Sequence, residues 1–131
     1  MTDERTVLFV CLHGAGMSRM AAAYFLSAAP AGWHAVSAGV EPADTLSPTA
    51  EAMLAGTEAA RFLDHAPPRP INAVDEPRRV IALRNPSIQY ELASDESWDL
   101  TSSAGAPLRD EIRDRAVAFA RTLAAQKREA S

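Results

Sequence analysis

Residues 6–26 combine an apolar run, a loop with two glycines and an Ala-rich stretch, and this order restricts the fold strongly. Residues 6–11 (Thr-Val-Leu-Phe-Val-Cys) are rich in β-branched and aromatic side chains, as in strands buried on both faces of a parallel sheet. Gly14 and Gly16 allow a tight turn, and the Ala-rich run after them indicates a helix. Unpaired N–H groups at the start of that helix would gather beside Cys11, so we expect an anion-binding loop there.

Cys11 is a candidate nucleophile, because the positive end of a helix stabilises a nearby thiolate. The alternative interpretation is a small apolar side chain that closes a buried strand, as free cysteines often do. Cys11 is the one cysteine of the sequence, which excludes an internal disulfide. Residues 1–5 lack the pattern of a signal peptide, and we therefore expect a cytoplasmic, reducing compartment.

Composition limits the function classes. With 131 residues, 47% hydrophobic and 23% charged, the sequence is typical of one globular domain, which we place at residues 1–131. The net charge of −4 argues against a nucleic-acid partner or an anionic membrane surface. No apolar run approaches the roughly 20 residues that span a bilayer, so we expect no membrane partner.

The rest of the chain alternates between strand and helix patterns. Strands are predicted over residues 33–38, 79–83 and 97–100, and helices from Ser47-Pro48 to about Leu63 and over residues 108–127. Residues 87–96 show no clear helix. This alternation predicts an α/β fold, a three-layer sandwich with a parallel four-stranded sheet and helices on both faces.

Two motifs resemble the low-molecular-weight protein tyrosine phosphatases and, more closely, the related single-domain arsenate reductases, whose loop reads Cys-x-His-Asn-Ala-Gly-Arg-Ser. The matching residues here are Cys11, His13, Ala15, Gly16, Ser18 and Met20. Residues 37–43 (Ser-Ala-Gly-Val-Glu-Pro-Ala) are similar to a second family motif at the family's spacing. The resemblance covers residues 6–63 and 97–125. It implies strand order 2-1-3-4, with the site at the carboxyl end of the first strand.

The sequence departs from the family at two loop positions. The family's asparagine is Gly14 here, and its arginine, six residues after the cysteine, is Met17. In the family this arginine binds two oxygens of the phosphate or arsenate and stabilises the transition state. Methionine has neither charge nor an N–H donor. The resemblance therefore implies a degenerate anion-binding loop at the residues Leu12, His13, Gly14, Ala15, Gly16, Met17 and Ser18.

A second departure concerns the general acid. Family members have Asp-Pro shortly after a Trp-Asp-Leu strand, and that aspartic acid protonates the leaving oxygen in the phosphatases. Here Ser102 and Ser103 follow Trp98-Asp99-Leu100-Thr101, and a serine hydroxyl does not perform this acid step. Asp99 keeps its aligned position, where we expect a carboxylate that braces the second loop.

Arg19 is a candidate replacement for the missing arginine. It lies two residues after Met17, about 200° around a helix, which directs its side chain away from the loop unless the loop shifts. The alternatives are an oxyanion contact and a solvated surface arginine. We expect no metal, since Cys11, His13 and the other histidines lack the spacing of a tetrahedral site. By the resemblance, His13 is a loop-bracing side chain.

Two functions follow from these residues. In the first, the protein is catalytically impaired or repurposed, and binds an anion such as phosphate, a small ligand or a protein at the loop. In the second, it is an enzyme in which Cys11 attacks phosphate or arsenate, and Arg19 or backbone N–H groups hold the oxyanion. No cofactor is predicted. As an arsenate reductase with one cysteine, the protein would need an external thiol, as the mycothiol-dependent members do.

Overall fold

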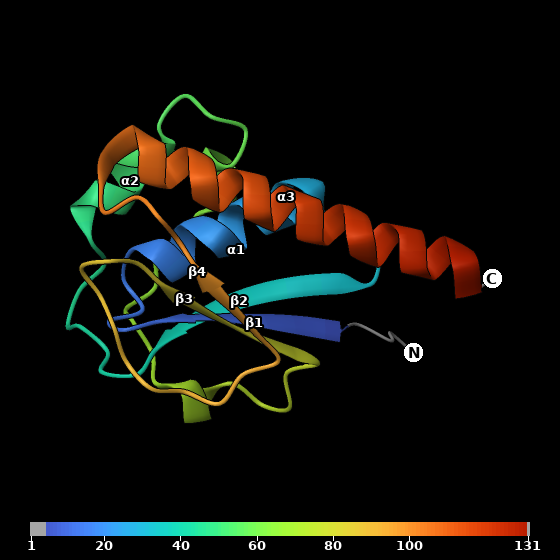
Figure 1. Ribbon diagram of the computed structural model, residues 1–131, viewed down its shortest axis with the longest axis horizontal. Coiled ribbons are helices and arrows are strands. Elements are labelled where there is room, and N and C mark those ends of the chain that lie inside the picture. Colours follow the sequence, from blue (N-terminus) through green and yellow to red (C-terminus); the bar gives the residue numbers. More distant parts are fainter. Residues whose placement is uncertain (1–4, 131) are drawn as a thin grey trace.

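The computed structural model describes residues 5–130, with the backbone alone for residues 127–130. The N-terminal stretch considered above for a signal peptide lies mostly outside these residues. Four parallel strands form one sheet in the order β2-β1-β3-β4 (Figure 1). They are β1 (Arg5–Cys11), β2 (Trp33–Gly39), β3 (Arg79–Arg84) and β4 (Glu96–Asp99). The predicted class, strand order and parallel pairing are confirmed.

The three α-helices cover one face of this sheet (Figure 1). They are α1 (Met17–Ala28), α2 (Pro48–Leu54) and α3 (Gly105–Ala130). On the opposite face the helical element is a single 3₁₀ turn, η2 (Ile71–Ala73), accompanied by irregular segments. The sandwich therefore has one thick helical layer and one thin layer. The prediction of helices on both faces is wrong for the described residues, because the segments that cover the other face, such as the proline-rich residues 67–77, form no α-helix.

Strand β1 lies inside the sheet and contributes residues to the cores on both of its faces. Residues Val7 to Val10 are completely buried, as the apolar run predicts. Phe9 faces the helices, where its ring centroid lies 5.8 Å from that of Phe25 and 5.6 Å from that of Trp98. Phe119 of α3 closes this aromatic cluster, with ring centroids 5.8 Å from Phe25 and 6.1 Å from Trp98. The cluster packs α1 and α3 against β1.

The helix predicted from Ser47 to about Leu63 is shorter in the structure. Ser47 caps it as expected, accepting a hydrogen bond from the Thr49 N–H. The helix ends at Leu54 because the Thr57 hydroxyl donates to the Leu54 carbonyl and also accepts from the Ala59 N–H. Such side-chain bonds compete with helix continuation. The chain resumes only as the 3₁₀ turn η1 (Ala60–Phe62).

The other boundaries differ less. The C-terminal helix begins at Gly105 and runs to Ala130, beyond the predicted range 108–127 at both ends, with Pro107 in its first turn. Residues 85–95 are irregular apart from a bridge between Asn85 and Ile88, in agreement with the missing helix pattern.

We predict that Phe25→Ala lowers the free energy of unfolding by about 3–5 kcal/mol, because it removes a fully buried ring that contacts two others. Urea unfolding followed by circular dichroism measures this loss. The control Val40→Ala changes an exposed side chain and should stay within about 0.5 kcal/mol of the wild type. Equal stability of both variants would contradict the assigned core.

Candidate functional site

The loop between β1 and α1 lies against the end of β2 with no space for side chains between the two backbones. Gly14 has φ +65°, in the left-handed region that favours glycine. A Cβ atom on Gly14 would lie 2.6 Å from the Gly39 nitrogen, and one on Gly39 would lie 2.5 Å from the His13 carbonyl carbon. This close approach leaves no room for a Cβ atom at Gly14 or at Gly39.

Most carbonyl groups of the loop point outward. Four of them accept hydrogen bonds from the segment that follows β2, in the pairs Val40 N to Cys11 O (3.2 Å), Glu41 N to Leu12 O (2.7 Å), Ala43 N to His13 O (3.0 Å) and Ser47 N to Ala15 O (3.1 Å). In a planar trans peptide the next N–H points the opposite way. The N–H groups of residues 12–16 therefore turn toward the inside of the loop, where a helix N-terminus also favours negative charge.

Cys11 lies at the centre of this arrangement. It is 4% exposed, and its Sγ accepts a hydrogen bond of 3.3 Å from the Gly14 N–H. The thiol donates to the Ser18 hydroxyl at 3.1 Å, and that hydroxyl can donate in return to a thiolate. Both partners of the sulfur thus belong to the wall of the loop and hold the Cys11 side chain in place.

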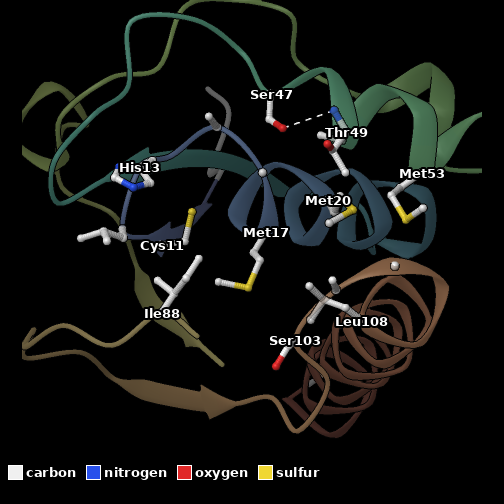
Figure 2. Close-up of a pocket in the computed structure, with 16 residues that line it drawn as sticks. Cys11, His13, Met17, Met20, Ser47, Thr49, Met53, Ile88, Ser103 and Leu108 are labelled. Atoms are coloured by element: carbon white, nitrogen blue, oxygen red, sulfur yellow. Dashed lines mark hydrogen bonds between the residues drawn. The ribbon is translucent and has the colours of Figure 1, made fainter. Parts of the chain in front are cut away.

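A pocket of about 310 Å³ opens beside Cys11 (Figure 2). Leu12, His13, Ala15, Gly16 and Met17 of the predicted loop line it, whereas Gly14, Ser18 and Arg19 do not. Methionines and aliphatic residues of α1, α2, α3 and residues 85–95 form its other walls, notably Met20, Met53, Ile88 and Leu108. No Arg, Lys, Asp or Glu is among its lining residues in the part of the chain that the structure describes.

Met17 lines the middle part of this pocket. Figure 2 shows its side chain with Cys11 and Ile88 on one side and Ser103 and Leu108 on the other. The residue is 6% exposed. Where the family resemblance implies a guanidinium, this protein therefore has a buried thioether.

Arg19 lies on the other side of the loop, as its position two residues further along the helix predicts. Its Nε donates to the Gly14 carbonyl at 2.9 Å, and its Nη1 donates to the Asp64 carbonyl at 2.7 Å. The alternative of a solvated surface arginine is wrong, because Arg19 is 1% exposed. Burial lowers the pKa of Arg19, and the Asp64 carboxylate, 4.0 Å from Nη1, works against that shift.

Asp64 and Arg69 complete this brace, and sequence reasoning did not identify them as site residues. Arg69 donates to the Asp64 carboxylate at 2.8 Å and to the Ser37 carbonyl at 2.7 Å. Partial burial works to raise the pKa of Asp64, but the hydrogen bonds from Arg69 and the Ala66 N–H outweigh it, and the pKa lies below its usual value. The signal in the sequence is an acid–base pair within a proline-rich loop.

The second loop is braced by a residue other than the predicted one. The Glu111 carboxylate accepts hydrogen bonds from the N–H groups of Thr101 and Ser102 and from the Thr101 hydroxyl. Partial burial acts to raise the pKa of Glu111, yet these donors hold it below its usual value. Asp99 is exposed at the end of β4 and lies outside the pocket. Sequence reasoning missed Glu111 because it lies ten residues further along, in α3.

Of the two predicted serines, only Ser103 lines the pocket. The Asn85 amide donates to the Ser103 carbonyl at 3.2 Å and joins the second loop to residues 85–95. No carboxylic acid takes the place of the family's general acid among the described residues that line the pocket.

Tyr90 fixes residues 85–95 beneath the sheet. Its hydroxyl is shared between the carbonyl groups of Val10 (2.9 Å) and Leu83 (2.7 Å), and burial raises its pKa. The Arg84 guanidinium lies 4.7 Å from the Tyr90 ring centroid and donates to the Tyr90 carbonyl at 2.7 Å. These contacts hold Ile88 in the pocket wall, a role that no sequence pattern indicated.

His13 is exposed, and its Nδ1 lies 3.1 Å from the Glu41 carbonyl, as suits a side chain that braces the loop. Within residues 5–130, no three His, Cys, Asp or Glu side chains come close enough together to hold a metal ion. Nor does any helix described there have the length and apolar character needed to cross a membrane.

Known proteins resemble this chain in structure. The sequence matches no protein-family model and no curated protein. An arsenate reductase from Archaeoglobus fulgidus is 30% identical, with a TM-score of 0.69 over 87% of this chain and 98% of that one. Two structures share the fold: an arginine phosphatase from Geobacillus stearothermophilus (20% identity, TM-score 0.70, 95% and 96% covered) and a low-molecular-weight protein tyrosine phosphatase from Bacillus subtilis (21%, 0.62, 95% and 97%).

We predict that Gly39→Ala destabilises the protein by about 1–3 kcal/mol, because the new methyl group would overlap the His13 and Gly14 backbone. Gly16→Ala is the matched control, since a Cβ there has no atom within 4 Å. Thermal unfolding of both variants measures the difference. A Gly39→Ala variant as stable as Gly16→Ala would show that the two backbones are not in contact.

The brace predicts a pH dependence. The pKa of Asp64 is lower in the folded state, so its carboxylate contributes stability above the unfolded pKa of about 3.9, and this contribution is lost as pH falls through the folded pKa. Asp64→Asn should be less stable than wild type at pH 7. Urea unfolding should show that the difference in the free energy of unfolding between the two proteins decreases below about pH 4. Asp75→Asn, at an exposed position, is the control. A difference that is independent of pH would argue against the ion pair.

Proposed function

The chain belongs to the superfamily of low-molecular-weight protein tyrosine phosphatases and arsenate reductases, and from that premise we propose that it is a catalytically impaired member repurposed for binding. The observation that supports this proposal is Met17, a buried thioether at the position of the family's anion-binding arginine. The loop is then a binding site for an oxyanion or another small ligand, or for a group that a partner protein presents. Its free thiol fits a cytoplasmic, reducing compartment.

Electrostatics supports low turnover. Attack on phosphate or arsenate concentrates negative charge on the oxygens in the transition state, and removing one donor at such a position commonly costs about 10²–10³ in rate. A charged, bidentate arginine should be worth more than one neutral donor. The missing general acid adds a further loss, commonly about 10²–10⁴. Either loss alone would leave the reaction slow.

Arg19 does not restore the missing charge in this arrangement. Its Nε and Nη1 already donate to the carbonyl groups of Gly14 and Asp64, behind the loop. A direct oxyanion contact would require both hydrogen bonds to break and the buried side chain to move around the helix. We propose instead that Arg19 keeps the Gly14 peptide turned with its carbonyl outward.

A second candidate function, an active cysteine enzyme, is favoured by the surroundings of Cys11. The Gly14 N–H and the Ser18 hydroxyl both contact its sulfur, which suits a thiolate nucleophile. In that case the thiolate attacks phosphate or arsenate, and the inward N–H groups of the loop hold the oxyanion. Arsenate reduction would then require an external thiol such as mycothiol to release the product from Cys11.

Hydrolysis of an aryl phosphate at mildly acidic pH, and arsenate reduction with excess small thiol, separate the two candidates. We predict that the wild type and Cys11→Ser give the same background, and that Met17→Arg hydrolyses the aryl phosphate at least tenfold faster than this background because it restores the bidentate donor. Met17→Leu is the matched control and should gain nothing.

Each outcome discriminates. Wild-type turnover that disappears in Cys11→Ser would contradict the impaired reading and favour the active enzyme. Faster hydrolysis by Met17→Arg would mean that the other residues of the site still support the reaction. An unchanged rate would contradict the prediction and mean that further positions of the pocket prevent the reaction.

A further inference from the structure

We propose that the pocket beside Cys11 binds a small apolar acid, namely one carboxylate attached to an aryl or short alkyl body, in preference to phosphate. The proposal rests on the proposed function, because it assumes that the loop binds ligands without rapid phosphate chemistry. It is carried by the combination of an apolar cavity and an inward-facing set of backbone donors, with no Arg or Lys among the described residues that line the cavity.

The walls of the cavity determine the body of the ligand. Met17, Met20, Met53, Ile88 and Leu108 come from four separate segments and present apolar side chains to the same space (Figure 2). Methionine side chains adapt their shape and make favourable contacts with aromatic rings. A dry apolar cavity of about 150 Å³ already binds benzene. A volume of about 310 Å³ therefore has room for a ring with a short linker and a polar head.

The loop end of the cavity determines the head. Here the carbonyl groups of residues 11–13 and 15 are held outward by Val40, Glu41, Ala43 and Ser47, so that the intervening N–H groups face inward. Backbone N–H groups are good partners of a carboxylate, which can accept two or three of them. No acidic side chain lines the cavity to repel such a head within the described residues.

The missing cation determines the charge of the head. Phosphate near neutral pH carries between one and two negative charges, and removing the doubly charged form from water is costly without a positive partner. No Arg or Lys faces the cavity among the described residues, and the guanidinium of Arg19 is held behind the loop by Gly14 and Asp64. Backbone N–H groups are dipoles without a net charge, so they suit a head with a single negative charge better than one with two.

The apolar end also disfavours inorganic phosphate. Phosphate at the loop would leave Met20, Met53 and Leu108 without a ligand contact, whereas an aryl or alkyl body removes this apolar surface from water. Both ends of the cavity thus select the same class of compound.

Titration of the wild type with three probes tests the class. The probes are 3-phenylpropanoate, its neutral amide 3-phenylpropanamide, and inorganic phosphate. We expect the acid to bind at least tenfold more tightly than either of the others, since hydrogen bonds to a charged acceptor are about twice as strong as neutral ones. In protein with ¹³C-labelled methionine methyl groups, the signals of Met17, Met20 and Met53 should shift when the acid is added.

Variants locate the site. Ile88→Asp places a negative charge in the cavity wall and should weaken binding of the acid at least tenfold. The control Ser87→Asp places the same charge one residue earlier, at an exposed position outside the cavity, and should change binding less than twofold. If Ile88→Asp does not fold, the methyl shifts of the wild type still decide where the acid binds.

The outcomes separate this proposal from the previous one. Phosphate or the amide binding as tightly as the acid, or no binding of the acid, would overturn the ligand class, whatever the turnover assay shows. Acid binding with the expected methyl shifts would support it even if Cys11-dependent turnover of aryl phosphate contradicts the impaired function.

Discussion

The hydrogen bonds between the loop carbonyls and the segment after β2 are the constraint on which the site depends. Residues 40–47 donate to the carbonyl groups of Cys11, Leu12, His13 and Ala15, and the facing glycines Gly14 and Gly39 make the required approach sterically feasible. Behind the loop, Arg19 holds the carbonyl of Gly14. Every one of these contacts involves a backbone group, so the shape of the loop depends little on the side chains that face the pocket.

Because the loop shape depends little on these side chains, the backbone of the site can stay the same while its chemistry changes. The anion-binding geometry is a property of peptide orientation and helix position, and it persists when the family's arginine is replaced by Met17. Charge and acid catalysis are properties of individual side chains, and no Arg, Lys, Asp or Glu lines the pocket among the described residues. The result is a loop that keeps its donors beside an apolar cavity, with a cysteine between the two. The proposed binding function rests on this combination.

The apolar patterns of the sequence are sufficient to predict the strands and the position of the loop, whereas the strand order was implied by the family resemblance that two motifs carry. The early end of α2 was not predicted, since it depends on the Thr57 hydroxyl, which bonds to Leu54 and Ala59 in place of the helix pattern. The braces of the site were missed for a different reason. Arg19 with Asp64, Glu111 with Thr101, and Tyr90 with Val10 join residues at least ten positions apart, and a single sequence does not reveal such pairs. For the site itself, the sequence reveals which side chains are present, such as the uncharged Met17.

The proposed ligand site depends on an inward donor set, which the backbone N–H groups of residues 12–16 form without an Arg or Lys side chain among the described lining residues. Amide ¹H–¹⁵N spectra recorded while a carboxylate ligand such as 3-phenylpropanoate is added test it directly. The account predicts downfield shifts of the amide protons of residues 12–16 that saturate together, with little change at residues 40–47, whose N–H groups already donate to the loop. Unchanged loop amides at a ligand concentration that saturates the methionine methyl signals would contradict it.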